Sequence, residues 1–234
     1  MREASCVAVI PAKDEADRIT ATVRAVRGLP QVARVIVVND GSSDGTAELA
    51  REAGAEVVTH KRTRGKAAAM TTGAAYAVVQ GQVELPILFA DADLEESASS
   101  LGALVDPVVE GTADMTIAVL PPQDRPGGGH GFVVRLAREG IHSLCGWEAT
   151  QPLSGMRCIS RVALETAKPL ARGWGVEVAL TIDVVRAGLT VREVPCELRH
   201  RVSGPGWRDQ LHRAAQYRDV WIALARRRMR RDAR

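Results

Sequence analysis

A chain of 234 residues with 46% hydrophobic content is long enough to bury the core of one α/β domain. The formal net charge of +3 is small and unevenly spread, because residues 226–234 carry six arginines against one aspartate. The rest of the chain is close to neutral, which argues against a nucleic-acid-binding protein with a broad basic face. Four widely spaced cysteines argue against a zinc ribbon or a disulfide framework and favour reduced thiols.

The first fifteen residues hold an apolar run that is too short, and too interrupted by charge, for a signal peptide. No window reaches the roughly 18 apolar residues that a membrane span needs. We therefore expect a cytoplasmic protein. Two interpretations of the arginine-rich end stay open: favourable charge at a helix C-terminus, or peripheral docking on the inner face of a membrane at about 1 kcal/mol per basic residue.

The first half of the chain alternates short apolar runs with amphipathic segments. The apolar runs predict strands at 6–12, 33–40, 55–60 and 85–90, and the segments 14–29, 41–54 and 65–80 predict turns and helices between them. Acidic residues open the first of these helices and suit its dipole. Strands that are apolar throughout, with helices between them, indicate a parallel sheet covered on both faces.

The second half is less regular. It predicts strands at 113–121, 151–160 and 190–201, helices at 132–146, at 175–188 and from Trp207 onward, and a loop at 122–131 that could act as a lid. No linker is long enough to separate independent domains. We expect one α/β domain with a mostly parallel, Rossmann-like sheet, comprising residues 1–95, residues 96–206 and a C-terminal amphipathic helix with its basic tail at 207–234.

Polar residues follow three of the predicted strands. They are Lys13 to Glu15, Asn39 with Asp40, and Asp91 with Asp93, and ligands of such sheets bind beyond the carboxyl ends of the strands. If the fourth strand continues to Asp93, its two aspartates point the same way. Carboxylate pairs suit Mg²⁺ or Mn²⁺, although these two could instead cap the helix that follows.

Lys66 and Asp40 complete this pattern. Lys66 stands at a predicted helix start, where a phosphate is favoured twice, by the dipole and by the ammonium; an ordinary surface lysine is the alternative. Asp40 could accept hydrogen bonds from a base or a ribose. The alternative is a turn and helix cap, which Ser43, Asp44 and Thr46 would satisfy.

The motifs "VAVIPAKDEADRI", "VIVVNDGSSDGTAELA", "RGKAAAM" and "ILFADADL" resemble the nucleotide-sugar half of the GT-A glycosyltransferases of family 2, in order and spacing. The resemblance covers about the first hundred residues. It implies a nucleotide-sugar site formed by Pro11, Ala12, Asp14, Glu15, Asp40, Ser42, Lys66, Asp91 and Ala92, with Asp91 and Asp93 holding the metal. The family often has Asn where this chain has Asp14.

The second half, through "QPLSGMRCIS", "GWGVEVALTID" and "VREVPCELRHR", is similar to the glucosyl-3-phosphoglycerate synthases and, more distantly, to the polyprenyl-phosphate glycosyltransferases. This likeness implies that His200 completes the metal site, although a surface histidine is the alternative. It also implies a sugar pocket lined by Leu153, Ser154 and Gly155, and acceptor contacts from Trp174, Gly175, Glu177 and Arg201. Glu177 could equally be a helix-start acid.

The function implied is metal-dependent transfer of a sugar from a nucleoside-diphosphate sugar, with UDP-glucose as an example, to a phosphorylated small molecule or a polyprenyl phosphate. Lys66 and Mg²⁺ or Mn²⁺ would stabilise the leaving diphosphate. An inverting enzyme would need a base, for which Glu177 and Asp183 are the candidates, whereas a phosphate acceptor would need none. Many such enzymes pair through C-terminal helices, so a homodimer stays open.

Three other functions are weighed against this one. A nucleotidyltransferase would have a glycine-rich loop after the first strand, and "IPAKDEADRI" has no glycine. A dinucleotide-binding dehydrogenase would need GxGxxG directly after a strand, and the "GGGHG" here lies in a long loop. A protein that binds a nucleotide sugar without transferring it would keep the same residues, so only turnover separates it from an enzyme.

Overall fold

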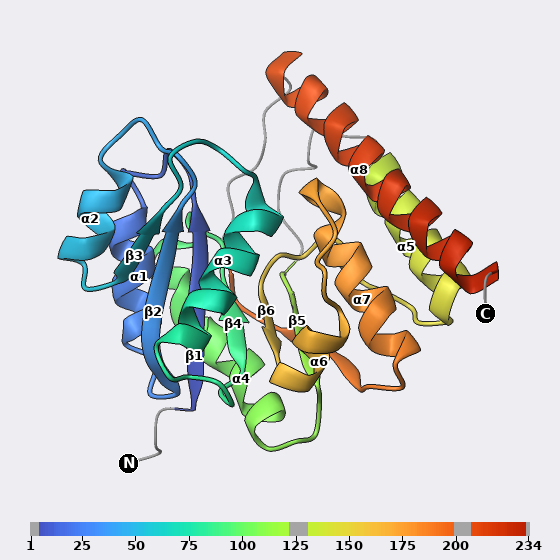
Figure 1. Ribbon diagram of the computed structural model, residues 1–234, viewed down its shortest axis with the longest axis horizontal. Coiled ribbons are helices and arrows are strands. Elements are labelled where there is room, and N and C mark those ends of the chain that lie inside the picture. The colour runs from blue at the N-terminus through green and yellow to red at the C-terminus, as the bar shows by residue number, and fades with distance from the viewer. Residues whose placement is uncertain (1–4, 122–130, 199–206, 233–234) are drawn as a thin grey trace.

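The computed structural model describes residues 5–121, 131–198 and 207–232, and at 207–213 and 230–232 the backbone alone. One seven-stranded sheet of order β3-β2-β1-β4-β6-β5-β7 runs through these residues (Figure 1). Its strands are β1 (Cys6–Ala12), β2 (Val32–Asn39), β3 (Glu56–Thr59), β4 (Ile87–Phe89), β5 (Met115–Val119), β6 (Arg157–Ile159) and β7 (Val191–Pro195). In this part of the chain β6 runs antiparallel to both of its neighbours, and the other pairs are parallel. The predicted α/β class with a mostly parallel sheet is confirmed.

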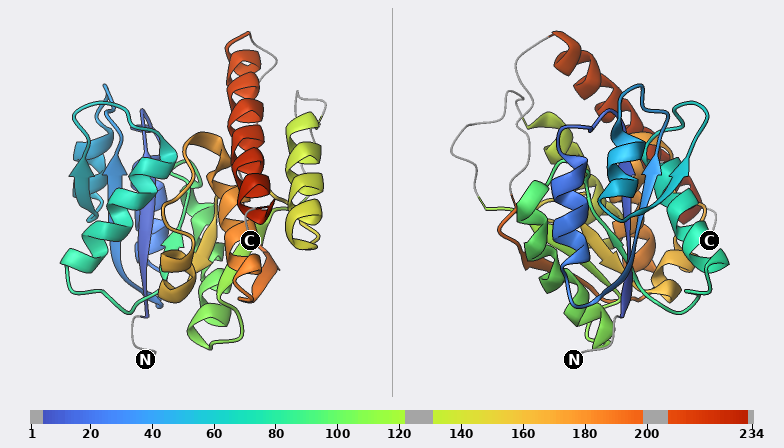
Figure 2. Two further views of the ribbon diagram at one scale, coloured as in Figure 1. Left: turned by 45° about the vertical axis from the view of Figure 1, so that its right-hand side comes forward. Right: turned by 90° about the vertical axis from the view of Figure 1, so that its left-hand side faces the viewer.

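Helices cover both faces of the sheet. One face packs against α1 (Ile19–Arg27), α2 (Thr46–Glu52), the 3₁₀ segment η1 (Glu95–Leu101) and α4 (Gly102–Val109). The other face packs against α3 (Lys66–Val79), α6 (Arg161–Thr166) and α7 (Val176–Arg186). A further layer, formed by α5 (Phe132–Cys145) and α8 (Trp207–Asp232), packs on the outer side of α7, and the two helices lie side by side (Figure 2).

The central strand β1 shows why the sheet is buried on both faces. Ala8 and Ile10 belong to the core beneath α1, Val7 and Val9 belong to the core beneath α3, and all four are fully buried. A glycine brings α3 close to this strand: a Cβ at Gly73 would collide with Val9. The close approach fixes the position of α3, whose first residue is Lys66.

The structure differs from the sequence expectations at three places. The first helix begins at Ile19 with no acidic residue in its first turn, because the preceding acids lie in the turn after β1. The helix considered after Asp93 is the 3₁₀ segment η1, and its continuation as α4 was not predicted, because Pro107 lies inside α4 and argues against a helix there. The helix at 161–166 was not predicted either: it is short, although Ser160 caps it by accepting from the amide of Ala163. The strand predicted at 190–201 is described as far as Pro195.

Across the described ranges, no helix is both long enough and apolar enough to cross a membrane.

Candidate active site

The two aspartates that follow β4 lie in a turn, because the strand ends at Phe89. They are therefore not aligned by strand geometry. Instead Thr22, a fully buried residue of α1, holds the turn: its hydroxyl donates to the carbonyl oxygen of Ala92 at 2.9 Å and accepts from the amide of Glu95 at 2.8 Å. Packing of α1 against this turn sets where both aspartates lie.

Lys66 lies between two carboxylates. Its Nζ is 2.7 Å from Oδ1 of Asp91 and 3.2 Å from Oε1 of Glu177, and we call these three residues the lysine cluster. They come from the start of α3, the turn after β4 and the first turn of α7. Burial alone would lower the pKa of Lys66, but Asp91 and Glu177 raise it well above its usual range. The ammonium therefore stays charged.

The backbone at Gly155 lies directly against the lysine cluster. A Cβ at this position would collide with Nζ of Lys66 and would lie 2.9 Å from Oδ1 of Asp91, so the lysine cluster keeps this geometry only with a glycine here. Next to it, Ser154 is buried and its Oγ has no hydrogen-bond partner within the described residues. A buried hydroxyl without a partner at a polar site is well placed to bind a polar group of a ligand.

Arg157 joins this loop to α7, and the sequence interpretation did not identify it. Its side chain is fully buried in β6, and it donates to the carbonyl oxygens of Pro152, Ser154 and Glu177 and to Oγ1 of Thr181 over 2.8–3.3 Å. Burial lowers the pKa of Arg157 to about 10, against the opposing effect of nearby carboxylates. An arginine two residues after a glycine, entering an apolar strand, was the available signal.

Asp40 organises the loop that precedes Lys66. Its Oδ1 is 2.7 Å from Nδ1 of His60 and accepts from the amide of Arg64 at 2.8 Å, while its Oδ2 accepts from the amide of Gly65 at 2.7 Å. The other ring nitrogen of His60 is 2.9 Å from Oγ1 of Thr72. Burial alone would raise the pKa of Asp40, but these hydrogen bonds lower it. His60, which the sequence interpretation also missed, ends a predicted strand.

The turns after β1 and β2 are cross-linked. Asp14, at φ 54°, donates its amide to Oγ of Ser42 at 3.0 Å and accepts from the amide of Ser43 at 2.8 Å. The amide of Glu15 donates to Oγ1 of Thr46 at 2.8 Å. Short polar side chains of one turn thus hold the backbone of the other. Asp14, Glu15, Asp40 and Ser42 lie at one edge of the sheet with the ends of β1, at Pro11 and Ala12, and of β2.

Arg18 connects this edge to Asp93. The guanidinium is 2.7 Å from Oε2 of Glu15. Its pKa is raised first by that hydrogen bond and further by the charges of Asp93 and Glu95. Asp93 therefore lies within electrostatic reach of the Arg18–Glu15 pair. Asp91, two residues earlier in the same turn, contacts Lys66.

The remaining predicted residues fall into four groups. Trp174 and Gly175 lie in the 3₁₀ turn η2 (Gly173–Gly175) against α8, where the amide of Trp174 donates to Oδ2 of Asp219 at 3.2 Å. The structure does not bring Asp183 into the lysine cluster, because its carboxylate pairs with Arg227 of α8. His200 and Arg201 lie outside the described residues. Leu153 packs on the apolar side of α5, α7 and α8.

A divalent cation fits Asp91 and Asp93 only as part of a larger ligand set. Among the described residues, no three His, Cys, Asp or Glu side chains gather into a metal site. Mg²⁺ characteristically takes one or two carboxylates and completes its shell with substrate phosphates and water. Two aspartates of one turn, of which Asp91 contacts Lys66, and the unpaired buried hydroxyl of Ser154 match that chemistry. The residues present fit a metal that binds together with a diphosphate.

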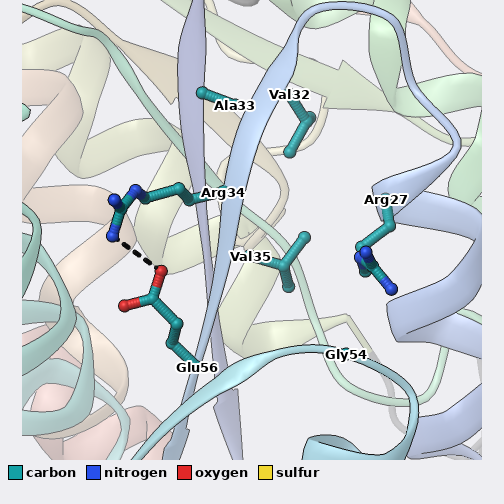
Figure 3. A pocket seen from close by; sticks show the side chains of 7 residues that line it. All are labelled: Arg27, Val32, Ala33, Arg34, Val35, Gly54 and Glu56. Atoms are coloured by element: carbon teal, nitrogen blue, oxygen red, sulfur yellow. Dashed lines mark hydrogen bonds and ion pairs between the residues drawn. The ribbon is translucent and has the colours of Figure 1, made fainter.

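A hollow of about 240 Å³ lies at the opposite edge of the sheet (Figure 3). Its lining residues are Arg27, Val32, Ala33, Arg34, Val35, Gly54 and Glu56. The charged groups are satisfied within the protein: Arg34 pairs with Glu56 at 2.9 Å, and Arg27 donates to the carbonyl oxygen of Ala53 at 3.1 Å. No predicted site residue lines it, so we place the candidate active site at the strand ends instead.

Comparison with known proteins identifies the family. The model of glycosyl transferase family 2 matches residues 7–140, more than half of the chain. The chain belongs to glycosyl transferase family 2. The matched residues include the ends of β1, β2 and β4 and the lysine cluster apart from Glu177. The resemblance seen in the sequence motifs is confirmed.

Solved structures of glucosyl-3-phosphoglycerate synthase from Mycobacterium tuberculosis are similar to this family 2 chain. The complex with Mn²⁺, UDP and glucosyl-3-phosphoglycerate has a TM-score of 0.76 and 27% identity, covering 95% of this chain and 80% of that one. The complex with Mn²⁺, UDP-glucose and phosphoglyceric acid has a TM-score of 0.76 and 29% identity, with 95% and 79% covered. A further complex of the same synthase contains Mg²⁺ and UDP. These similarities confirm the GT-A fold.

A sequence relative is the glycosyltransferase AglJ of Haloferax volcanii, 26% identical over 211 residues. The match covers 86% of this chain and 65% of AglJ, so the chain spans less than two thirds of that relative's length.

Proposed function

We propose that this family 2 protein is a metal-dependent glycosyltransferase that moves a sugar from a nucleoside-diphosphate sugar to a phosphorylated acceptor. The observation that carries the proposal is the lysine cluster: a charged lysine at a helix start, held between the aspartate that follows β4 and a buried glutamate. A site of this kind suits a diphosphate, because the helix N-terminus and the ammonium both favour phosphate oxygens.

UDP-glucose is the sugar donor that we favour, because the similar synthase binds UDP and UDP-glucose with Mn²⁺. In this proposal the turns after β1 and β2 hold the nucleoside, and Ser154 and Gly155 border the sugar. Asp40 then positions the loop before Lys66, in addition to any contact with the nucleoside, because both of its oxygens accept hydrogen bonds from the protein.

Breaking the sugar–phosphate bond leaves a diphosphate with new negative charge, which must be stabilised where it forms. Asp91 and Asp93 would hold Mg²⁺ or Mn²⁺, and the metal would neutralise part of that charge. In addition to the metal, the ammonium of Lys66 supplies a positive charge from the protein itself to stabilise the diphosphate. An ammonium has three donors, and the two carboxylates of the lysine cluster occupy two of them, which leaves one for a phosphate oxygen.

Neither of the two candidate bases, Glu177 and Asp183, is available in the described part of the chain, and this favours a phosphorylated acceptor over a neutral hydroxyl acceptor. Asp183 is paired with Arg227, and Glu177 is 3% exposed and pairs with Lys66. An acceptor phosphate that attacks through its own oxygen is already anionic and needs no base. We therefore favour an acceptor phosphate as the nucleophile, on a lipid or on a small molecule. An acceptor that attacks through a hydroxyl would require Glu177 to leave Lys66.

The direct test compares UDP and GDP, each with and without Mn²⁺, by thermal shift on the wild type and on Asp93→Ala. A ligand at 100 times its Kd stabilises the folded state by about 2.7 kcal/mol. We expect stabilisation by UDP that depends on Mn²⁺ and is lost in the variant. If neither nucleotide gives a metal-dependent shift, the two aspartates only order the turn after β4 and the proposal fails.

A second assay separates an enzyme from a protein that only binds the nucleotide sugar. UDP-glucose and Mn²⁺ are incubated with a short polyprenyl phosphate or with phosphoglycerate, and release of UDP is measured. Release that depends on one acceptor supports transfer and names the acceptor class. Tight UDP binding without release over both acceptors and over water would favour the binding protein.

A further inference from the structure

Helix α8 has two different faces. Its inner face is buried through Val220, Ala223 and Leu224, and Leu224 packs so closely on α5 that a Cβ at Gly140 would collide with it. Polar contacts fix the same face: Arg227 pairs with Asp183 of α7. The inner face therefore attaches α8 to the body of the protein and fixes which side of the helix points outward (Figure 2).

The outer face combines large apolar side chains with arginines. Tyr217, Trp221 and Met229 are 43%, 55% and 64% exposed, and at about 100° per residue they fall within about 120° of one another around the helix axis. Arg218, Arg226 and Arg228 are also exposed, and they lie in the same outward half of the helix. We call these six residues the outer face of α8.

Exposed acids are missing from this stretch. Between residues 214 and 229 the only acid is Asp219, and its side chain is 15% exposed. One oxygen of Asp219 accepts from the amide of Trp174, and the other pairs with Arg218. The outer face of α8 is thus apolar and positively charged, without an exposed carboxylate in the stretch whose side chains are described.

We propose that the outer face of α8 docks on an anionic lipid surface. Tryptophan and tyrosine favour the membrane–water interface because their rings are amphipathic, and arginines beside an apolar stripe are typical of helices that lie in the plane of that interface. Negative headgroups complement the three arginines. A second copy of the chain fits less well, because a twofold contact would bring like charges together without carboxylates to offset them.

Docking would hold the body of the protein against the lipid surface, with α8 lying between that surface and the turn η2. The turn η2, with Trp174 and Gly175, packs against α8: a Cβ at Gly175 would lie 2.6 Å from the carbonyl oxygen of Asp219 and 2.7 Å from Cβ of Ala223. Docking itself does not depend on transferase activity. Its use, which is to present a lipid phosphate to the site, rests on the proposed function.

The test measures co-sedimentation of the full chain with vesicles of phosphatidylcholine, with and without phosphatidylglycerol. We expect binding only to the anionic vesicles, and weaker binding at high salt. Arg226→Glu/Arg228→Glu removes two arginine contacts with the anionic headgroups. Loss of each contact should weaken vesicle binding about fivefold, equivalent to about 1 kcal/mol near an anionic surface. Trp221→Ser/Met229→Ser should also reduce binding, by removing the apolar contacts.

Matched controls use exposed residues on other elements. Val79→Ser, 79% exposed at the end of α3, and Arg24→Glu, exposed on α1, should bind the anionic vesicles as the wild type does. Metal-dependent UDP binding, measured in parallel, should be unchanged in every variant, since none of the substituted residues lies at the strand ends. Vesicle binding without UDP binding would leave docking standing and remove the proposed function.

Three results would overturn the docking proposal. They are failure to bind the anionic vesicles at low salt, equal binding to both kinds of vesicle, and equal loss of binding in the control and outer-face variants. Light scattering measures the oligomeric state and so tests whether a second copy of the chain occupies this face. A dimer in the wild type that becomes a monomer in Trp221→Ser/Met229→Ser would assign the face to that second copy.

Discussion

In the proposed arrangement the candidate site has a nucleotide side, formed by the turns after β1 and β2, and an acceptor side, formed by residues 152–155 and α7. Groups of opposite charge hold the two sides together. On the nucleotide side, the carboxylates of Asp14 and Asp40 accept hydrogen bonds from backbone amides of neighbouring loops. On the acceptor side, the guanidinium of Arg157 donates to backbone carbonyls of the 152–155 loop and α7. The lysine cluster lies where the two sides meet, because Asp91 comes from one and Glu177 from the other.

This difference has a physical consequence. A carboxylate can be protonated and so lose its interactions at low pH, whereas an arginine keeps its charge over the range in which proteins fold. Arg157 is also fully buried, so removing it leaves several acceptors without water to replace it. We therefore expect the acceptor side to respond most to substitution and the nucleotide side to respond most to pH.

The largest expected effect is that of Arg157→Met, which keeps most of the side-chain length but removes every donor. The carbonyl oxygens of Pro152, Ser154 and Glu177 would lose a partner. Each buried acceptor left unpaired costs about 1–3 kcal/mol, so the free energy of unfolding should fall by about 3 kcal/mol or more. Urea denaturation measures the change. Arg161→Met is the matched control: among the described residues its Nε and Nη1 have no hydrogen-bond partner, and Nη2 donates to one carbonyl oxygen, that of Gln82 at 2.6 Å, so one acceptor is left unpaired instead of three. Equal losses would show that Arg157 has no special structural role.

Lys66→Met should act on transfer more than on folding. Loss of one charged group that stabilises the leaving diphosphate should lower kcat about 10²–10³-fold in the UDP-release assay. The single variant also leaves Glu177 buried without its partner, which costs stability. The double variant Lys66→Met/Glu177→Gln should recover that stability without recovering transfer. Recovery of transfer in the double variant would contradict a role for Lys66 at the diphosphate.

Gly155→Ala tests whether the two sides must meet closely. The added Cβ would displace Nζ of Lys66 from Asp91, and overpacking of this kind costs about 1–3 kcal/mol. Because Nζ is the end of a flexible chain, we expect the loss to appear in UDP binding by calorimetry rather than in the melting temperature. Gly45→Ala is the control, since its Cβ would meet only an ordinary contact at 3.7 Å from Leu49. Unchanged UDP affinity in Gly155→Ala would argue that the Lys66–Asp91 contact is dispensable.

The smallest expected effect concerns Asp40 and appears as a dependence on pH. Its pKa is lower in the folded protein than its usual value of 3.8, so ionised Asp40 stabilises the fold above that pH. That contribution is lost as the pH falls through the lowered pKa. Urea denaturation over a series of acidic pH values should show a shallower decline in Asp40→Asn than in the wild type. Asp114→Asn is the control, because Asp114 lies directly before β5 and its carboxylate also accepts a hydrogen bond from a backbone amide, that of Thr190. Identical slopes for Asp40→Asn and the wild type would contradict the assignment.

Much of the nucleotide side could be predicted from sequence, because its signals are local. The apolar runs at 6–12 and 33–40 became β1 and β2, and the polar residues that follow them lie at one edge of the sheet, as expected for parallel strands. Lys66 begins a helix, as its position after Gly65 indicated. These features depend on residues that are close to one another along the chain, so the types of those residues are enough to predict them.

The acceptor side could not be predicted in this way, because its arrangement depends on contacts between residues that are far apart in the sequence. The apolar strand that contains Arg157 is a local signal of its burial, but it does not predict which carbonyl oxygens the guanidinium contacts. Nothing local predicts that Asp183 pairs with Arg227, or that Glu177 reaches Lys66 more than a hundred positions earlier. The same holds for the turn after β4, whose form is set by Thr22 of α1. A charged side chain can lie in solvent or in the interior with similar local sequence, and only the packing of the elements decides which carboxylate it meets.

Sequence by itself therefore determined the fold class, the family and the edge of the sheet at which we place the candidate site, because hydrophobic periodicity and the residues at strand ends are local features of the sequence. Tertiary structure decided which side chains form the lysine cluster, which arginine holds the acceptor side together, and which face of α8 points outward. Those outcomes require several elements to pack at once, and each charged group takes the partner that the finished packing brings within reach.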